Sequence, residues 1–261
     1  MKTIRKLWTR EELILAFNFY LKLPFGKMTS TNKEVIQFAN LIGRTPSSIA
    51  IRLTNFAACD PYHQARGVKG MVGGIKQCQP IWDEFFENKE TLIFESERIL
   101  AEKENLTIES KFDSVLDDIK DLKGEVKMRE VKTRVNQNFF RQLVLANYKS
   151  KCAVTGIDIP ELLFASHIIP WSKNEQERLN PENGICLSAL YDKAYDKGLI
   201  GINERHDIII SNELKRHQNK EYFKIHFSPV ENTKIQIPER FLPNKNFLQY
   251  HLDEIFALRN S

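Results

Sequence analysis

The chain has 261 residues, of which 42% are hydrophobic and 28% charged, and its formal net charge is +4. This length and apolar content can furnish the core of one large or two small globular domains, whereas no apolar run approaches the ~20 residues that span a bilayer. The opening stretch MKTIRKLWTREELI lacks the apolar centre of a secretory signal, so we expect a cytoplasmic protein with no membrane contact.

Charge is unevenly distributed along the chain. Residues 1–89 contain 13 Lys and Arg against 7 Asp and Glu, residues 90–130 contain 7 against 12, and residues 131–261 contain 18 against 15. A basic face binds phosphates by releasing counterions, although many soluble domains share so small an excess. These shifts predict a helical N-terminal domain over 1–89, a charged connector that is helical or partly flexible over 90–130, and a C-terminal domain over 131–261.

The first predicted element is a helix that follows Thr9. Thr9 and Glu12 have the spacing of a capping box, and Leu13 and Phe17 begin an apolar stripe at helical spacing. Pro24 should end this helix.

The segment EVIQFANLIGRTPSSIAIRLTNFAA has the spacing of a helix-turn-helix. Ala39 allows two helices to approach, Gly43 allows the tight turn, and Thr45 and Pro46 suit the cap and first turn of the second helix. An ordinary helical hairpin explains this short pattern equally well. If the segment reads DNA, the residues expected to face outward toward a groove are Arg44, Ser47, Ser48 and Arg52.

The next stretch, DPYHQARGVKG, is a basic loop that contains glycine. Arg66 and Lys69 are candidates for contacts with a phosphate or a base edge. A solvated turn is the alternative interpretation.

The C-terminal part mixes predicted helices and strands, which gives an α+β fold class. We expect a helix over NQNFFRQLVLANY, a buried strand over LLFASHII, a helix over ENGICLSALYDKAYDKG that Gly198 ends, and a hairpin over LIGINERHDIIIS with its turn at 203–207.

Three residues in this part suggest phosphodiester hydrolysis, which needs a base to deprotonate water and a divalent cation to neutralise charge. A hairpin that carries His167, packed against a helix that carries Asp192, would supply both, with Asn183 capping that helix and tying down the loop between. Taken singly, each residue has a plainer explanation: His167 as a core histidine, and Asp192 with Asp196 as a solvated helix face.

The motifs TRVNQNFFRQLVLANYKSKCAVTG, ASHIIPW, RLNPENGICLSALYDKAYDKGLI and FLPNKNFLQYHLDEIF, from about Arg134 to Phe256, resemble the HNH endonucleases of the ββα-metal type, in the branch of bacterial restriction enzymes and defence effectors. The resemblance implies that His167 is the general base, that Asn183 orients the hairpin and that Asp192 binds Mg²⁺ or Mn²⁺.

This sequence departs from the family pattern at two positions. Ser166 stands where many relatives have an acidic residue or histidine, and Tyr191 stands where close relatives often have histidine. The second protein ligand of the metal is therefore open, and Asp196, one turn from Asp192, is the reserve candidate. Arg178 is a candidate phosphate clamp, or else a solvated charge.

The four cysteines include no C-x-x-C pair, so we expect reduced, buried thiols and no structural zinc. The remaining histidines, including His251, are interpreted as structural.

The resulting hypothesis is a metal-dependent endonuclease that cuts double-stranded DNA as a restriction enzyme. Restriction enzymes that recognise a modified base are included in this hypothesis. One HNH site cuts one strand, so cutting both strands would favour a homodimer. The alternatives are a DNA-binding regulator without catalysis and a nuclease toxin that cuts RNA or any nucleic acid.

Overall fold

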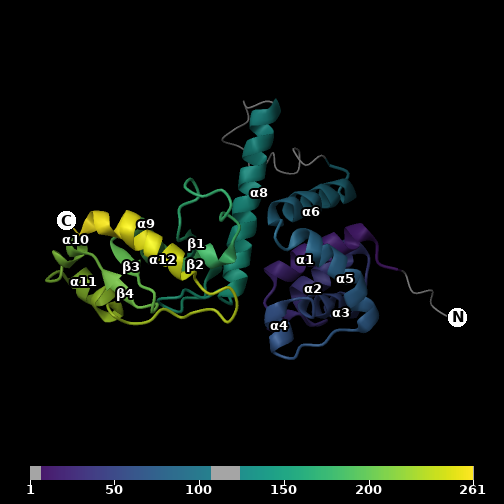
Figure 1. The fold of residues 1–261 in the computed structure, drawn as a ribbon, viewed down its shortest axis with the longest axis horizontal. Helices are drawn as coiled ribbons and strands as arrows, with labels where there is room; N and C mark the ends of the chain where they lie inside the picture. The colour runs from purple at the N-terminus through teal and green to yellow at the C-terminus, as the bar shows by residue number, and fades with distance from the viewer. Residues whose placement is uncertain (1–6, 107–123, 261) are drawn as a thin grey trace. The chain divides into compact units, whose positions relative to one another are not determined.

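A computed structural model describes residues 7–106 and 124–260, and the chain divides into two compact units, Met1–Phe139 and Phe140–Ser261. The second unit contains two antiparallel two-stranded sheets along with its helices (Figure 1). The structure therefore has the mixed α+β composition that the sequence predicts. Within the described ranges, no helix combines the length and apolar character needed to cross a bilayer.

The first unit is helical throughout its described part. Its α-helices are α1 (Arg10–Lys22), α2 (Lys33–Ile42), α3 (Pro46–Ala57), α4 (Pro61–Ala65), α5 (Val72–Phe85) and α6 (Lys89–Lys103). α1 packs against α3, α5 and α6. At the centre of this packing, the ring of Phe17 stacks on Phe56 with centroids 5.0 Å apart and lies 5.3 Å from the ring of Trp82.

The predicted start and end of α1 are confirmed. The backbone N–H of Glu12 donates to Thr9 Oγ1 over 3.2 Å, and the Thr9 N–H donates to Glu12 Oε2 over 2.9 Å, which is the reciprocal capping box. The helix ends at Lys22, two residues before Pro24.

The predicted pair of helices around Gly43 is also confirmed. Gly43 ends α2 with a φ of 68°, a left-handed conformation that glycine adopts without strain. Thr45 caps α3 by accepting a hydrogen bond from the Ser48 N–H over 3.2 Å, and Pro46 is the first helical residue.

The predicted connector contains ordered helix at both of its ends. α6 buries Leu92, Ile93 and Ile99 and packs on α1. α8 (Gly124–Asn147) runs without interruption across residue 131, and the two compact units divide within it. The middle of the predicted connector, 107–123, lies outside the described residues.

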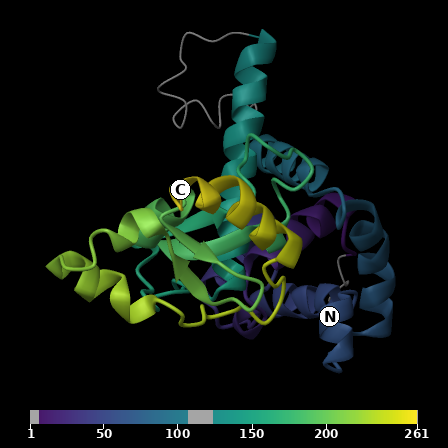
Figure 2. The ribbon, with the colours of Figure 1, turned by 60° about the vertical axis from the view of Figure 1, so that its left-hand side comes forward.

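The second unit contains the end of α8 followed by short strands and helices. These are β1 (Leu163–His167), β2 (Gly184–Ser188), α9 (Ala189–Asp196), β3 (Ile200–Ile202), β4 (Ile208–Ile210), α10 (Asn212–Lys215), α11 (Glu221–His226) and α12 (Lys245–His251). The C-terminal helical segment, yellow in Figure 2, lies beside β3.

β1 and β2 form an antiparallel pair in which His167 is opposite Gly184 and Leu163 is opposite Ser188. The prediction of one helix over 182–198 was wrong at its start, because 184–188 form β2 and the helix α9 begins only at Ala189. The reason is burial: all five residues of β2 are buried, so pairing with β1 satisfies backbone groups that water cannot reach.

The end of that helix and the following hairpin are confirmed. Gly198 has a φ of 67° just after α9, and β3 pairs antiparallel with β4. The Asn203 N–H donates to the Asp207 carbonyl over 3.0 Å and closes the predicted turn.

Candidate active site

His167, the last residue of β1, lies half-buried between two aromatic side chains. Its ring stacks on Phe140 of α8 with centroids 3.7 Å apart and planes inclined by 15°. The Trp171 ring meets the imidazole edge-on at 5.4 Å and 84°. These two contacts fix the orientation of the imidazole ring.

A backbone hydrogen bond determines which ring nitrogen of His167 can act as a base. Nε2 lies 3.0 Å from the carbonyl oxygen of Arg178. A carbonyl oxygen only accepts, so Nε2 carries the proton and Nδ1 keeps its lone pair in the neutral ring. Among the described residues, no side chain or backbone group hydrogen-bonds to that Nδ1.

The surroundings of His167 also keep the ring neutral. The pKa of His167 is lowered from 6.5 to about 4, mainly because the ring is buried; the bond to the Arg178 carbonyl opposes this shift, and the charge of Arg178 adds to it. The ring is therefore uncharged at neutral pH, which is the form that accepts a proton.

Asn183 ties down the loop that follows β1, as the sequence predicts. Its side-chain oxygen accepts from the Ile169 N–H over 2.8 Å, and its side-chain nitrogen donates to the carbonyls of Ile169 and Glu177 over 3.2 and 3.1 Å. Asn183 does not cap α9, because β2 separates the two. The bond to Glu177 holds the residue directly before Arg178, whose carbonyl binds His167.

The side chain of Arg178 is engaged within the same loop. Its Nε donates to the Trp171 carbonyl over 2.7 Å, its guanidinium lies 5.1 Å above the Trp171 ring, and Nη1 is 3.3 Å from Glu175 Oε1. The clearest contribution of Arg178 to the site is therefore its backbone carbonyl. Its role in binding phosphate stays a prediction.

Asp192, in the first turn of α9, contacts β1 at the residue before His167. The buried Ser166 hydroxyl donates to Asp192 Oδ1. Burial raises the pKa of the Asp192 carboxyl, the bond from Ser166 lowers it, Asp196 raises it and Lys193 lowers it. Asp196 itself is exposed, and its Oδ2 lies 3.7 Å from Lys197 Nζ.

Neighbouring residues of a strand point to opposite faces. β1 accordingly directs His167 toward Phe140 on α8 and Ser166 toward Asp192 on α9. Asp192 of α9 therefore contacts β1 at Ser166, the neighbour of His167, but on the other face of the hairpin. No hydrogen bond joins the two side chains.

The oxygen atoms at Asp192 fit an open site for a divalent cation. Magnesium and manganese prefer oxygen ligands, and Mg²⁺ commonly uses one or two carboxylates together with water and substrate phosphate. Ser166 and Asp192 supply such atoms, and a cation would offset the burial that raises the Asp192 pKa. In the described part of the chain, no three His, Cys, Asp or Glu side chains gather into a closed metal site.

Sequence reasoning missed several residues that shape the site. Phe140 lies 27 positions before His167 in the sequence, so no local pattern connects them. Gly184, opposite His167, makes this approach possible, because a Cβ there would lie 2.8 Å from Phe140 Cζ and 2.4 Å from Val144 Cγ2. Trp171, four residues after His167 in ASHIIPW, was the one local signal available.

Tyr191 and the nearby cysteines belong to the core of this unit. Tyr191 is buried, and its hydroxyl donates to the His226 carbonyl, so it anchors α11. Cys152 and Cys186 are buried, free thiols. His251 is also buried, stacked on Tyr195 with centroids 3.7 Å apart.

In the first unit, the prediction that Arg44 and Arg52 face outward was wrong. The Arg44 guanidinium forms a bidentate ion pair with the Glu12 carboxylate, with N–O distances of 3.1 and 2.6 Å. The side chain of Arg44 is 7% exposed and that of Glu12 is 6% exposed. Arg52 is 5% exposed and donates to Gln77 over 2.8 Å. The ring of Trp8 lies 4.3 Å from the first guanidinium and 4.5 Å from the second. Aromatic stacking and pairing with an acid on α1 make burial of these charges tolerable.

The other predicted DNA-binding residues of this unit are accessible. Ser47, Arg66 and Lys69 are exposed and Ser48 is half-buried. Arg66 also donates to the Tyr62 hydroxyl over 3.1 Å. Their contact with DNA stays a prediction.

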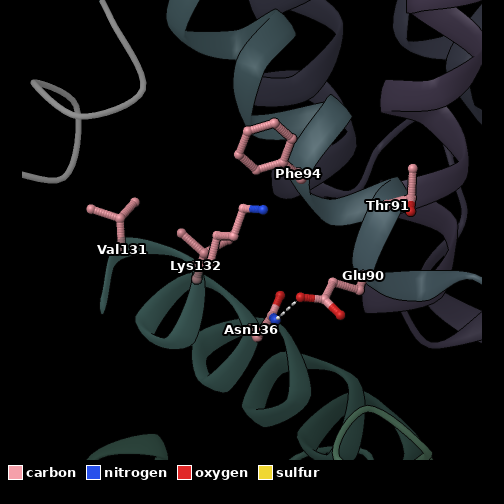
Figure 3. Close-up of a pocket in the computed structure, with 7 residues that line it drawn as sticks. Glu90, Thr91, Phe94, Val131, Lys132 and Asn136 are labelled. Atoms are coloured by element: carbon pink, nitrogen blue, oxygen red, sulfur yellow. Dashed lines mark hydrogen bonds between the residues drawn. The ribbon is translucent and has the colours of Figure 1, made fainter. Parts of the chain in front are cut away.

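A pocket of about 330 Å³ lies between α6 and the first half of α8. Figure 3 shows that the Glu90 carboxylate meets the Asn136 side chain there, over 3.2 Å, and that Lys132 extends toward the Phe94 ring, 5.0 Å away. Its two charged groups are both engaged, and none of its lining residues is a histidine or cysteine. The residues that the sequence predicts for hydrolysis, His167, Asn183 and Asp192, all lie in the second unit instead.

Comparison with known proteins supports this location. Compared with curated proteins, the chain matches none. Residues 152–203, however, match the HNH endonuclease family, and this segment contains β1, the loop held by Asn183, β2 and α9. Within the second unit, this matched segment is therefore similar to the HNH endonucleases.

Proposed function

We propose that the chain is a divalent-metal-dependent endonuclease that hydrolyses phosphodiester bonds of double-stranded DNA, with His167 as general base and Asp192 as the metal ligand. The observation that carries the proposal is the bond from His167 Nε2 to the Arg178 carbonyl. It leaves a basic nitrogen on a ring that Phe140 and Trp171 hold in place.

In the proposed reaction, Nδ1 of His167 takes a proton from a water molecule, which attacks phosphorus in line with the 3′ oxygen. The bond from phosphorus to that oxygen breaks, which leaves a 5′ phosphate. The Arg178 carbonyl stabilises the ring as it becomes positively charged, because the Nε2 hydrogen bond strengthens when the donor is charged. Asn183 positions this carbonyl through its bond to Glu177.

Asp192 and Ser166 would hold the cation, with Asp196 as a reserve ligand. A bound divalent cation would neutralise negative charge on the phosphate and on the leaving oxygen. Because His167 and Asp192 lie on the two faces of β1, we infer that the scissile phosphate lies across the C-terminal end of this strand.

The choice of DNA and of a restriction role rests on organisation. A separate helical unit with a helix-turn-helix pair precedes the nuclease domain. A separate unit that recognises DNA favours cleavage at selected sites over unselective cleavage. A homodimer would allow both strands to be cut.

The test is cleavage of supercoiled plasmid by the purified full chain with Mg²⁺ or Mn²⁺. We expect His167→Ala to lower the rate about 10²–10⁴-fold, the contribution typical of a general base, and excess EDTA to abolish cleavage. His217→Ala, at an exposed histidine outside the site, is the matched control and should cut normally.

Full activity of His167→Ala would remove the proposed base, and activity in excess EDTA would remove the metal. If the protein cut transfer RNA faster than plasmid, its substrate would be RNA and not DNA. Tight DNA binding without cleavage under any divalent cation would favour a regulator.

A further inference from the structure

Two adjacent apolar side chains project into solvent at the start of α5. Val72 is 74% exposed and Met71 is 57% exposed. Single exposed apolar residues are common on protein surfaces, but here two consecutive ones leave most of their surface in solvent, which favours a partner that covers them.

The backbone that carries this pair is fixed to α3. The Met71 N–H donates to Asn55 Oδ1 over 2.8 Å. A Cβ at Gly70 would lie 2.8 Å from the same oxygen, and one at Gly74 would lie 2.1 Å from Asn55 Nδ2. The glycines on both sides of Met71 and Val72 therefore let the loop pack closely on Asn55, which holds the two apolar side chains in a defined position.

The sequence on both sides of the pair is basic. Residues 61–82 contain Arg66, Lys69 and Lys76 and no Asp or Glu. Both lysines are exposed, and within the described chain neither forms an ion pair. This combination of an apolar pair and flanking cations complements a polyanion that also offers apolar surface.

We propose that Met71 and Val72 form a wedge that enters duplex DNA at a base step while Lys69 and Lys76 contact the adjacent phosphates. Proteins that kink DNA insert apolar side chains between bases in this way, and lysines next to the wedge bind the backbone by counterion release. The proposal deepens the proposed function, on which it rests, by assigning DNA contact to this loop in place of the buried Arg44 and Arg52.

A membrane is the other partner that combines negative charge with apolar surface. Binding to a bilayer interface normally uses an amphipathic helix that buries a whole apolar face. Here the apolar surface is two adjacent residues, the cap and the first residue of α5, which matches the size of a base step better.

The experiment measures binding of the full chain to a fluorescein-labelled duplex in EDTA, so that no strand is cut. We expect Met71→Ser with Val72→Ser to weaken binding about tenfold without changing its salt dependence. Lys69→Gln with Lys76→Gln should lower the slope of log affinity against log salt by about 2, since each phosphate contact contributes about 0.9. Controls of equal chemistry are Leu41→Ser, an exposed residue on α2, and Lys27→Gln with Lys33→Gln, which should bind as the wild type does.

A duplex that contains 2-aminopurine detects the wedge directly, because this base brightens when it unstacks. The wild type and the conservative Met71→Leu with Val72→Ile should raise its fluorescence at least twofold, and the double serine variant should not. Unchanged affinity and fluorescence in the serine variant would overturn the wedge. The wedge would also be overturned if the serine variant lost binding to phosphatidylserine vesicles but still bound DNA normally. Thermal unfolding checks that each variant folds, and the single serine variants replace the double one if it does not.

The proposal and the nuclease assignment fail separately. If the serine variant binds normally while cleavage depends on His167, the wedge is wrong and the nuclease remains. If the serine variant loses DNA binding while His167→Ala still cuts, the wedge remains and the proposed base is wrong.

Discussion

His167 depends on two neighbours for the properties that a general base needs. The carbonyl of Arg178 fixes the tautomer, and burial against Phe140 lowers the pKa to about 4. Because the folded pKa lies below the ordinary 6.5, the unfolded chain binds the proton first as pH falls. This histidine therefore contributes stability that is present above pH 6.5 and is lost between pH 6.5 and about 4.

The first prediction concerns the titration of that ring. In ¹⁵N-histidine NMR of the full chain, His167 should titrate near pH 4, and Trp171→Ala should move its midpoint toward 6.5 by admitting water to the ring. His251, whose pKa burial also lowers to about 4, is the internal control and should not move. A wild-type midpoint near 6.5 for His167 would contradict the proposed environment.

The second prediction concerns the metal oxygens. Ser166 already donates to Asp192, so Ser166→Asp would place a second carboxylate beside the first. We expect Mn²⁺ affinity, measured by calorimetry without DNA, to rise about tenfold, because hard cations bind more tightly as ligand charge increases.

Asp192→Asn should lose detectable Mn²⁺ binding, whereas Asp196→Asn should reduce it only slightly if Asp196 is a reserve ligand. Equal Mn²⁺ affinity for wild type and Asp192→Asn would place the metal elsewhere.

At the scale of secondary-structure elements, the site is made by packing the hairpin β1–β2 against α8 on one face and α9 on the other. Gly184 sets the closeness of the α8 contact, since a Cβ there would overlap Phe140 and Val144. We therefore expect the geometry of the site to depend on this glycine.

Gly184→Ala should consequently destabilise the protein by about 1–3 kcal/mol, the usual cost of overpacking a core, and should also slow cleavage by shifting Phe140 under His167. Urea unfolding measures the first effect and plasmid cleavage the second. Gly26→Ala, where a Cβ meets nothing within 4 Å, is the matched control. Normal stability and cleavage for Gly184→Ala would show that the contact is not tight.

At the scale of the whole molecule, the chain consists of two units that each have their own core. The buried ion pair between Glu12 and Arg44 fastens α1 to the turn between α2 and α3 in the first unit. Removing one partner of a buried pair leaves an uncompensated charge, which costs about 3–5 kcal/mol.

Glu12→Gln should therefore loosen the first unit and leave the second intact. Hydrogen exchange should increase in α1, α2 and α3, while protection of β1, β2 and α9 stays unchanged. An equal increase in both units would mean that they unfold together.

Much of the local structure was predictable because its causes are local. The capping box at Thr9, the turn at Gly43, Pro46 at the start of α3, and Gly198 after α9 each act within a few residues. The motif around His167 and Asn183 was visible for the same reason, and it pointed to the nuclease family.

What the sequence could not decide is which charges are buried and which side chains meet across elements. Arg44 and Arg52 looked like a DNA-reading face, yet pairing with Glu12 and stacking on Trp8 placed them inside the first unit. Residues 184–188 looked helical, yet burial on both faces made them a strand. The sequence by itself determined helix caps, turns and the motif that is similar to HNH endonucleases, because these depend on neighbours in the chain. Only the tertiary structure decided the tautomer of His167 and the two faces of β1, because those depend on contacts between residues far apart in the sequence.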